Sequence, residues 1–509
     1  MSRITSKRPD RKAIEARRKE NGAAKKALRE RQQAAGLEPR RPPALPNRKS
    51  DYETVEEEQK ARQEATQAQL QVMRQMLPIL LRRLAKIPDF RNPKKLKHKL
   101  TVLMIWGILL FVYQMDSRRQ ANQKLTRPMF LENLRAFLPE LESCPHQDTL
   151  NRLLAGIDVD QIEAALVELV RRLIRKKKFL RFLIQNGYPV VFDGTQKHRR
   201  SELLGEQWLQ RQVGKEGEKK TQYTVYVLEA SLAFQNGMVL PLLSEFLDYT
   251  EGDTSQNKQD CELKAFYRLA ARLKRLFPRL PILVLGDGLF ANGPVMELCR
   301  KNNWDFMIVL QDDSLPSVWE EVHGLRELQE KNQLDRTWGD RRQHFWWVNE
   351  IEYRFGTNQR KRQTVHVVVC EEAWEEIDDA TNLPVTKTSR HVWLSSKQLN
   401  HGNVHKRCNL GARHRWGIEE GILVEKCHGY HYEHVLSHDW NAMRGYHYLM
   451  RIGHALNILA QYGAALIGLV QTLGVRGFID FVRETMAGPW LNVEQVREAL
   501  AKPYQLRLA

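Results

Sequence analysis

The chain has 509 residues, a formal net charge of +19 at pH 7 and a sequence pI of about 9.6. A chain of this length exceeds one ordinary hydrophobic core, so we expect roughly two to four domains. The positive charge favours a polyanionic partner, and nucleic acid before a membrane. The six cysteines are scattered without a C-x2-C pair, which argues against a zinc ribbon or a disulfide framework and indicates a reducing cytoplasm.

Residues 1–66 are rich in Lys, Arg, Glu, Gln and Ala and have almost no large apolar side chains. This composition predicts a basic arm that is disordered or only locally helical. Contact with a DNA backbone and a simple solubilising role fit this arm equally well.

Residues 67–182 show the apolar periodicity of helices and are expected to form a helical domain. The basic stretch 171–178 could bind DNA, or the domain could be a scaffold for the next one. No helix-turn-helix pattern decides between the two. The apolar run 100–113 is interrupted by Thr101 and Gly107 and is too short to cross a bilayer comfortably, so a membrane role is disfavoured.

Residues 183–313 change to short apolar runs that alternate with amphipathic segments. Asn236-Gly237 separates two of these runs and is typical of a hairpin turn. The order strand, hairpin, helix, strand, helix, strand predicts a mixed sheet covered by helices. The expected strands are 188–192, 223–234, 238–247, 280–288 and 305–312, and the expected helices are 261–277 and 293–303.

Residues 314–390 are predicted to be a β-rich insertion, because two long segments alternate and are rich in aromatics. Trp346 and Trp347 lie in the first of these segments and are candidates for stacking on an unpaired base. Packing in a β-domain core fits these side chains equally well. Residues 391–396 look like a strand that returns to the main sheet, within a segment 391–470, and residues 471–509 are expected to be helical.

Two Asp-Gly pairs, at Asp193 and Asp287, each close an apolar strand-like run. Metal-dependent phosphoryl transfer uses divalent cations held by oxygen ligands, and glycine lets a phosphate or a strand approach closely. A single Asp-Gly pair after a strand is most often a turn. Two such pairs in one sheet make coincidence less likely, so both aspartates are candidate metal ligands.

Arg415, Glu419 and Lys426 have the spacing R-x3-E-x6-K, which places all three on one face of a helix. Glu420 points about 100° away from that face. With the two aspartates, this stripe predicts a three-carboxylate metal site flanked by cations that bind phosphate. A surface stripe of salt bridges would have the same spacing.

The histidines that follow this stripe invite a metal interpretation of their own. They lack the paired spacing of zinc ligands, so polar or DNA-facing roles are favoured. The residues concerned are His428, His431, His434 and His438.

The segments Asp193-Gly-Thr, LGDGLFANGP around Asp287 and ARHRWGIEEGILVEK around Glu419 resemble the DDE transposases of bacterial insertion sequences. The group in question carries a Y-R-E-K signature and a β-strand insertion before the glutamate. The segment 429–457 is also similar to the stretch that follows the glutamate in these enzymes, and the resemblance covers roughly 90–465. Ala412 stands where the signature has a tyrosine, so a DNA contact made by that tyrosine is not carried over.

The resemblance implies a ribonuclease H-like α/β core whose two parts, 183–313 and 391–470, flank the insertion. It implies that Asp193, Asp287 and Glu419 are catalytic and hold two Mg²⁺ ions, for which Mn²⁺ can substitute. It also implies that Arg415 and Lys426 contact transposon-end DNA.

The implied partner is double-stranded DNA, as terminal inverted repeats and as target, bound by a homodimer in the nucleoid-associated cytoplasm of a bacterium. Two alternatives stay open: a ribonuclease H-like nuclease without strand transfer, and a catalytically inactive DNA-binding derivative.

Overall fold

The computed structural model describes residues 10–38, 45, 47, 49–139, 141, 143–215, 217, 219–248 and 261–509. The chain divides into two compact units, and each is built from segments far apart in sequence. Unit 1 comprises Met1–Ala44, Gly286–Lys301 and Asp305–Cys408, and unit 2 comprises Leu45–Leu285, Asn302–Trp304 and Asn409–Ala509. The expected segment 183–313 therefore contributes to both units.

The strands of unit 2 form a mixed arrangement in the order β2-β3-β1-β5, with β4 also paired to β3. Only the β1–β5 pair is parallel among these described pairs. The hairpin predicted at Asn236-Gly237 is confirmed, because β3 and β4 pair antiparallel and Gly237 has a φ of 85°. The strands are β1 (Tyr188–Arg200), β2 (Leu209–Val213), β3 (Lys220–Ala233), β4 (Val239–Phe246) and β5 (Ile282–Gly286).

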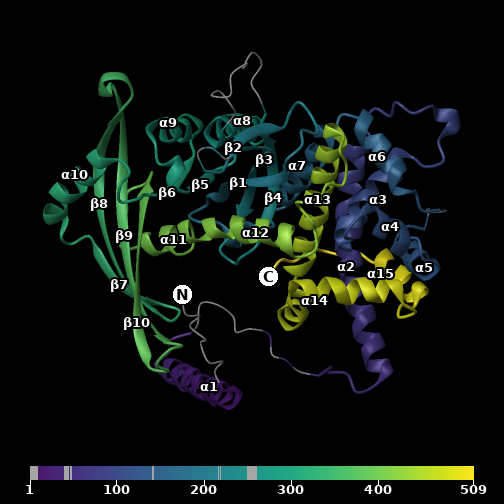
Figure 1. The fold of residues 1–509 in the computed structure, drawn as a ribbon, viewed down its shortest axis with the longest axis horizontal. Helices are drawn as coiled ribbons and strands as arrows, with labels where there is room; N and C mark the ends of the chain where they lie inside the picture. Colours follow the sequence, from purple (N-terminus) through teal and green to yellow (C-terminus); the bar gives the residue numbers. More distant parts are fainter. Residues whose placement is uncertain are drawn as a thin grey trace. The chain divides into compact units, whose positions relative to one another are not determined.

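Helix α13 is the central helix of unit 2, and Figure 1 shows it between the strands and the N-terminal helices. It contacts α2, α3, α6 and α7 as well as β4, so it is buried on nearly every side. Polar residues of α13 are buried among its apolar ones, and Arg451, His454 and Asn457 are hydrogen-bonded there.

The helices of unit 2 come mainly from the N-terminal and C-terminal parts of the chain. They are α2 (Val55–Leu84), α3 (Leu100–Val112), α4 (Arg118–Lys124), α5 (Pro128–Phe137), α6 (Gln147–Gly156), α7 (Asp160–Arg175), α8 (Glu262–Leu276), α12 (Trp416–Cys427), α13 (Trp440–Gln461), α14 (Ile467–Ala487) and α15 (Val493–Ala501).

The strands of unit 1 are antiparallel in the order β6-β10-β9-β8-β7. The alternating aromatic segments form β8 and β9, and the end of β10 pairs with β6, as expected for a returning strand. The strands are β6 (Asp305–Val309), β7 (Gln333–Trp338), β8 (Arg341–Phe355), β9 (Lys361–Ile377) and β10 (Pro384–Ser395), and the helices are α1 (Arg11–Ala34), α9 (Gly293–Asn302), α10 (Pro316–Arg326) and α11 (Val404–Cys408).

The arm was expected to be disordered or only locally helical, and the structure shows local helix: residues 11–34 form helix α1, and residues 55–66 begin α2. Asp10 caps α1 by accepting a hydrogen bond from the backbone N–H of Lys12. The sequence of α1 is rich in Ala, Glu, Lys and Arg and has high helix propensity. Contacts with β9 stabilise the helix further. Most of the proline-rich stretch 40–48 lies outside the described residues.

We expect the substitution Gly293→Ala to destabilise unit 1. A Cβ atom at Gly293 would lie 2.2 Å from the Phe355 ring, and overpacking of this kind costs about 1–3 kcal/mol. The matched control is Gly324→Ala in α10, where a Cβ meets nothing within 4 Å and alanine favours the helix by roughly 0.5–1 kcal/mol. Thermal unfolding of the full chain should show a lower Tm for the first variant only. Equal Tm values would contradict the packing.

Candidate active site

The three predicted carboxylates lie on different elements. Asp193 follows the buried start of β1 but lies within the strand, which continues to Arg200 and not only to residue 192 as the sequence predicted. Glu419 lies in the first turn of α12, and both residues belong to unit 2. Asp287 belongs to unit 1, where it caps the short helix η4 (Gly288–Phe290) by accepting a hydrogen bond of 2.9 Å from the N–H of Leu289. All three side chains are partly exposed.

The parallel pair of β1 and β5 fixes the register of the two aspartates. Val191 and Leu285 are register partners. Asp193 comes two residues after Val191, and Asp287 comes two residues after Leu285. Each aspartate therefore lies the same number of residues past the end of the parallel pairing, although β1 itself continues beyond Asp193.

Gly194 is required by packing against α8. A Cβ at this position would lie 2.5 Å from the Glu262 carboxylate, which accepts a 2.6 Å hydrogen bond from the Tyr226 hydroxyl. The sequence suggested that this glycine makes room for a phosphate or a strand. The structure instead shows that it makes room for a helix side chain on the face opposite Asp193.

The stripe on α12 is ion-paired within unit 2. Arg415 Nη1 lies 2.9 Å from Glu419 Oε1, and Lys426 Nζ lies 2.8 Å from Glu433 Oε1. The Arg415 side chain is 7% exposed, and its guanidinium carbon lies 4.3 Å from the centre of the Trp416 ring. Both cations are therefore ion-paired in this structure, Arg415 within the stripe and Lys426 with a residue outside it. Glu420 is exposed.

A buried charge cluster that the sequence analysis missed joins α12 to the strands. Arg451 of α13 places Nη1 3.1 and 3.2 Å from the two carboxylate oxygens of Glu425, and Nη2 3.3 Å from Glu229 Oε2. Both glutamate side chains are 0% exposed. Burial raises the pKa of each carboxyl group, but the charge of Arg451 outweighs it, so both pKa values lie below their usual range.

Further polar groups complete this cluster. The Tyr432 hydroxyl donates to Glu229 Oε1 at 2.9 Å, and His454 Nδ1 lies 2.7 Å from Glu425 Oε1. Lys197 of β1 donates to the carbonyl of Tyr432 at 2.9 Å, and burial lowers the pKa of Lys197 to about 8. Because Glu229 is the register partner of Asp193, the cluster lies on the face of the sheet to which Asp193 belongs. The signal in the sequence was the presence of charged residues within the otherwise apolar helix 440–461.

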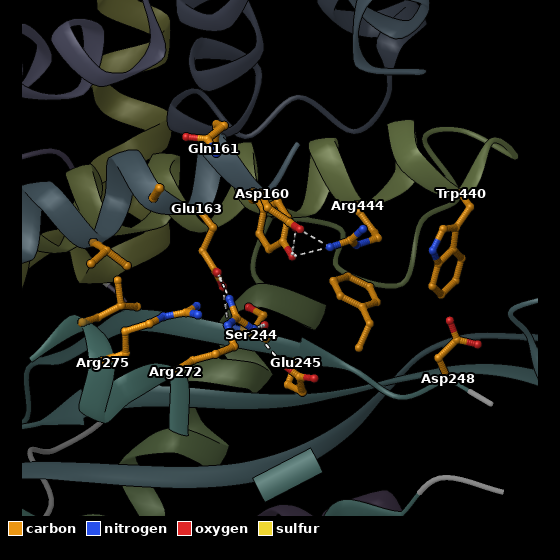
Figure 2. A pocket seen from close by; sticks show the side chains of 15 residues that line it. Asp160, Gln161, Glu163, Ser244, Glu245, Asp248, Arg272, Arg275, Trp440 and Arg444 are labelled. Carbon is orange, nitrogen blue, oxygen red and sulfur yellow. Dashed lines mark hydrogen bonds and ion pairs between the residues drawn. The ribbon is translucent and has the colours of Figure 1, made fainter. Parts of the chain in front are cut away.

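A polar cavity of about 490 Å³ adjoins the cluster between α7, α8, β4 and α13. Ser244 connects the two: its N–H donates to Glu163 at 2.7 Å and its hydroxyl donates to Glu229 at 2.6 Å. Figure 2 shows Arg272 lying between Glu163 and Glu245. Burial raises the pKa of Glu163 to about 7, against the opposing charge of Arg272.

The two tryptophans predicted to stack on bases are buried in unit 1. Trp346 is 7% exposed and Trp347 is 1% exposed. The guanidinium of Arg326 lies 4.2 Å from the centre of the Trp346 ring, and His401 packs edge-on against Trp347 at 5.1 Å. This environment matches the β-domain core interpretation and leaves neither ring face open to a base.

Within the part of the chain that the structure describes, no three His, Cys, Asp or Glu side chains are grouped so as to hold one metal ion. The chemistry of the predicted donors nevertheless suits a hard divalent cation, because all are carboxylates on separate elements. To bind such an ion, Glu419 would have to give up its ion pair with Arg415. Among the histidines after the stripe, His431 instead pairs with Asp116 at 2.9 Å.

Comparison with known families gives one match. Residues 81–170 match the family model described as DDE_Tnp_1-associated, which indicates a DDE-type transposase family. The matched segment runs from the end of α2 into α7 and precedes all three carboxylates. No curated protein matches the chain. Among the described residues, no helix combines the length and apolar character needed to span a bilayer.

We expect Arg451→Met to destabilise the protein strongly. The substitution leaves Glu229 and Glu425 buried without their cation, and loss of one partner of a buried pair costs about 3–5 kcal/mol. Adding Glu425→Gln should restore part of this loss, because one of the unpaired charges is removed. Chemical denaturation of the full chain measures both effects.

The control for this experiment is Arg354→Met. Arg354 pairs with Glu352 at 2.8 Å, but the two side chains are 53% and 45% exposed, so the change should cost little stability. Similar losses for Arg451→Met and Arg354→Met would show that the buried cluster does not support unit 2.

The stability of the protein should fall as pH drops from about 6.5 toward 4. Burial lowers the pKa of His198 to about 3 and that of His366 to about 4. Between these values and the unfolded value of about 6.5, the unfolded chain binds more protons, so stability present above pH 6.5 is lost on acidification. His198→Phe, which retains a ring against Trp208, should lose less Tm between pH 7 and pH 5 than the native chain. Exposed His428→Phe is the control, and equal pH slopes in all three proteins would refute the assignment.

Proposed function

We propose that this chain is a DNA transposase that cleaves DNA at the inverted-repeat ends of an insertion sequence and joins those ends to target DNA. The observation that carries this proposal is that Asp193 and Asp287 each lie two residues past the last position at which β1 and β5 pair as parallel strands. The carboxyl end of a parallel pair is the kind of position at which open α/β sheets bind ligands. The match of residues 81–170 to a transposase-associated family supports the same assignment.

In the proposed site, Asp193, Asp287 and Glu419 hold two Mg²⁺ ions, or Mn²⁺ in their place. When bound, such ions lower the pKa of a coordinated water and stabilise the leaving oxygen of an in-line displacement. A water oxygen first attacks the phosphorus at the transposon end, and the 3′-oxygen leaves. The oxygen of the freed 3′-hydroxyl then attacks the phosphorus of a target phosphodiester, and the 3′-oxygen of the target strand leaves and is protonated. No covalent enzyme intermediate forms.

The ion pairs of Arg415 and Lys426 suggest how the proposed site binds metal ions and DNA. Arg415 neutralises Glu419, and Lys426 is held by Glu433. A guanidinium and an ammonium both bind phosphate well, Arg415 with two parallel hydrogen bonds. We propose that Arg415 would pass from Glu419 to a DNA phosphate if Glu419 held a metal ion. The carboxylate of Glu419 would then be neutralised by the ion, and the guanidinium of Arg415 by the phosphate.

The DNA partner and the assembly follow from the same proposal. A chain with a net charge of +19 suits a double-stranded DNA partner, and binding should weaken steeply with salt. Two transposon ends require two active sites if each is processed by its own copy of the chain. We therefore propose a homodimer on DNA.

We expect Asp193→Asn and Glu419→Gln each to reduce cleavage and joining by about 1,000-fold, or roughly 4 kcal/mol of barrier, with DNA binding retained. The matched control is Glu420→Gln, since Glu420 is exposed and adjacent to Glu419 but points elsewhere. The assay uses labelled duplexes carrying the inverted repeats that flank the gene, with target DNA and Mg²⁺.

The products distinguish the proposal from its alternatives. Cleavage without joining by the native chain would identify a nuclease without strand transfer. Binding without cleavage would identify an inactive DNA-binding derivative. Full activity of Asp193→Asn would overturn the assignment of the site.

A further inference from the structure

Helix α1 is held against the β9–β10 hairpin of unit 1 by a set of polar contacts (Figure 1). Arg17 donates to the carbonyl of Asp379 at 2.8 Å, and Lys25 Nζ lies 2.9 Å from Asp379 Oδ1. Asn21 donates to Asp379 Oδ1 at 3.1 Å, and Arg31 forms an ion pair with Glu375. These contacts, called the clamp below, join residues more than 340 positions apart in the sequence.

The clamp fixes which face of α1 points to solvent. Leu28 is the one residue of α1 that is buried, at 8% exposure, and Asn21 lies on the same face because seven residues make nearly two helical turns. A contact at one point would leave the helix free to rotate. Contacts spread from Arg17 to Arg31, with a buried leucine between them, hold a single orientation.

The opposite face of α1 carries a row of lysines, Lys12, Lys19 and Lys26, called the lysine stripe below. Their seven-residue spacing places them on one side of the helix, about 10 Å apart and about 21 Å from first to last. All three are exposed. Within the described residues, the ion pair found for the stripe is Lys26 with Glu30, at 3.9 Å and with both side chains largely exposed, which contributes little.

A solvated face is the ordinary explanation for a row of lysines, but the clamp argues against it here. A solubilising tail needs no fixed orientation. This helix uses four polar side chains and one leucine to hold its lysine stripe outward. A length of about 21 Å matches about six base pairs of duplex DNA, at about 3.4 Å for each pair along one strand.

We propose that α1 is a DNA-backbone-binding element, in which the clamp orients the helix and the lysine stripe contacts phosphates without reading sequence. The proposal rests on the transposase function only for the choice of DNA as the polyanion. Its tests measure binding and not catalysis.

The first experiment removes the stripe with Lys12→Gln, Lys19→Gln and Lys26→Gln together in the full chain. Glutamine has nearly the helix propensity of lysine, so α1 should persist. Binding to a 30-base-pair duplex of arbitrary sequence is measured as a function of salt concentration. Loss of three phosphate contacts should reduce the slope of log K against log salt by about two to three.

The matched control removes three exposed lysines from other elements of unit 1, with Lys331→Gln, Lys387→Gln and Lys406→Gln. It lowers the net charge by the same amount, so it reports the general effect of charge. The proposal is overturned if the stripe variant keeps the native slope, or if its slope changes no more than that of the control.

The second experiment loosens the clamp with Asp379→Asn and Glu375→Gln. Its control, Glu320→Gln with Glu321→Gln on α10, removes the same charge from exposed positions of the same unit. Loss of the fixed orientation should make the clamp variant bind the duplex more weakly than the control. Tighter binding than the control would mean that Asp379 and Glu375 compete with DNA for α1, which overturns the proposal in favour of an autoinhibitory contact. If both binding experiments give the expected results but the native chain shows no strand transfer, the transposase function fails. The proposed role of α1 in binding DNA then still stands.

Discussion

The structure of unit 2 depends on one guanidinium group, that of Arg451, held between Glu425 and Glu229. A charge in a low-dielectric interior is tolerated only when it is paired and hydrogen-bonded. Arg451 and both glutamates meet this condition together, because the three come from α13, α12 and β3. A rotation of α12 that withdrew Glu425 would leave buried charges unpaired, so the cluster fixes the rotation of the helix that carries Glu419.

The rotation of α12 determines which of its charged side chains lie at the surface, where they could bind metal or phosphate. Glu425 follows Glu419 by six residues, which is about 240° around the helix. With Glu425 turned fully inward, Glu419 lies at the surface with its side chain 40% exposed, and Lys426 shares its face. The same network reaches Lys197 on β1, four residues after Asp193, so the strand and the helix that carry two candidate ligands share one set of buried contacts.

Local patterns predicted the elements well, whereas long-range pairings could not be predicted. The hairpin at Asn236-Gly237, the strands β8 and β9 and the helix of Glu419 each follow from periodicity and turn chemistry within a few residues. The fixed position of α1 depends on Asp379, and the burial of Glu425 depends on Arg451. No local sequence pattern indicates either partner, because each lies far away in the chain. For the site, spacing pointed to the candidate carboxylates but ended the first strand before Asp193, whereas β1 continues to Arg200. Spacing also could not distinguish a phosphate-binding cation from one paired with Glu419 or Glu433.

Ala412 shows how a departure from the Y-R-E-K pattern fits the local structure. This residue is 3% exposed in the short helix η7 (Ala412–Arg415), so its position faces the interior of unit 2. An aromatic side chain is present instead at Trp416, which is 56% exposed and lies beneath the guanidinium of Arg415. The cation that covers Glu419 therefore also covers an indole face. Transfer of Arg415 to a phosphate would uncover a carboxylate for metal and an aromatic surface for DNA in the same movement, which couples the two ligands of the proposed reaction through one side chain.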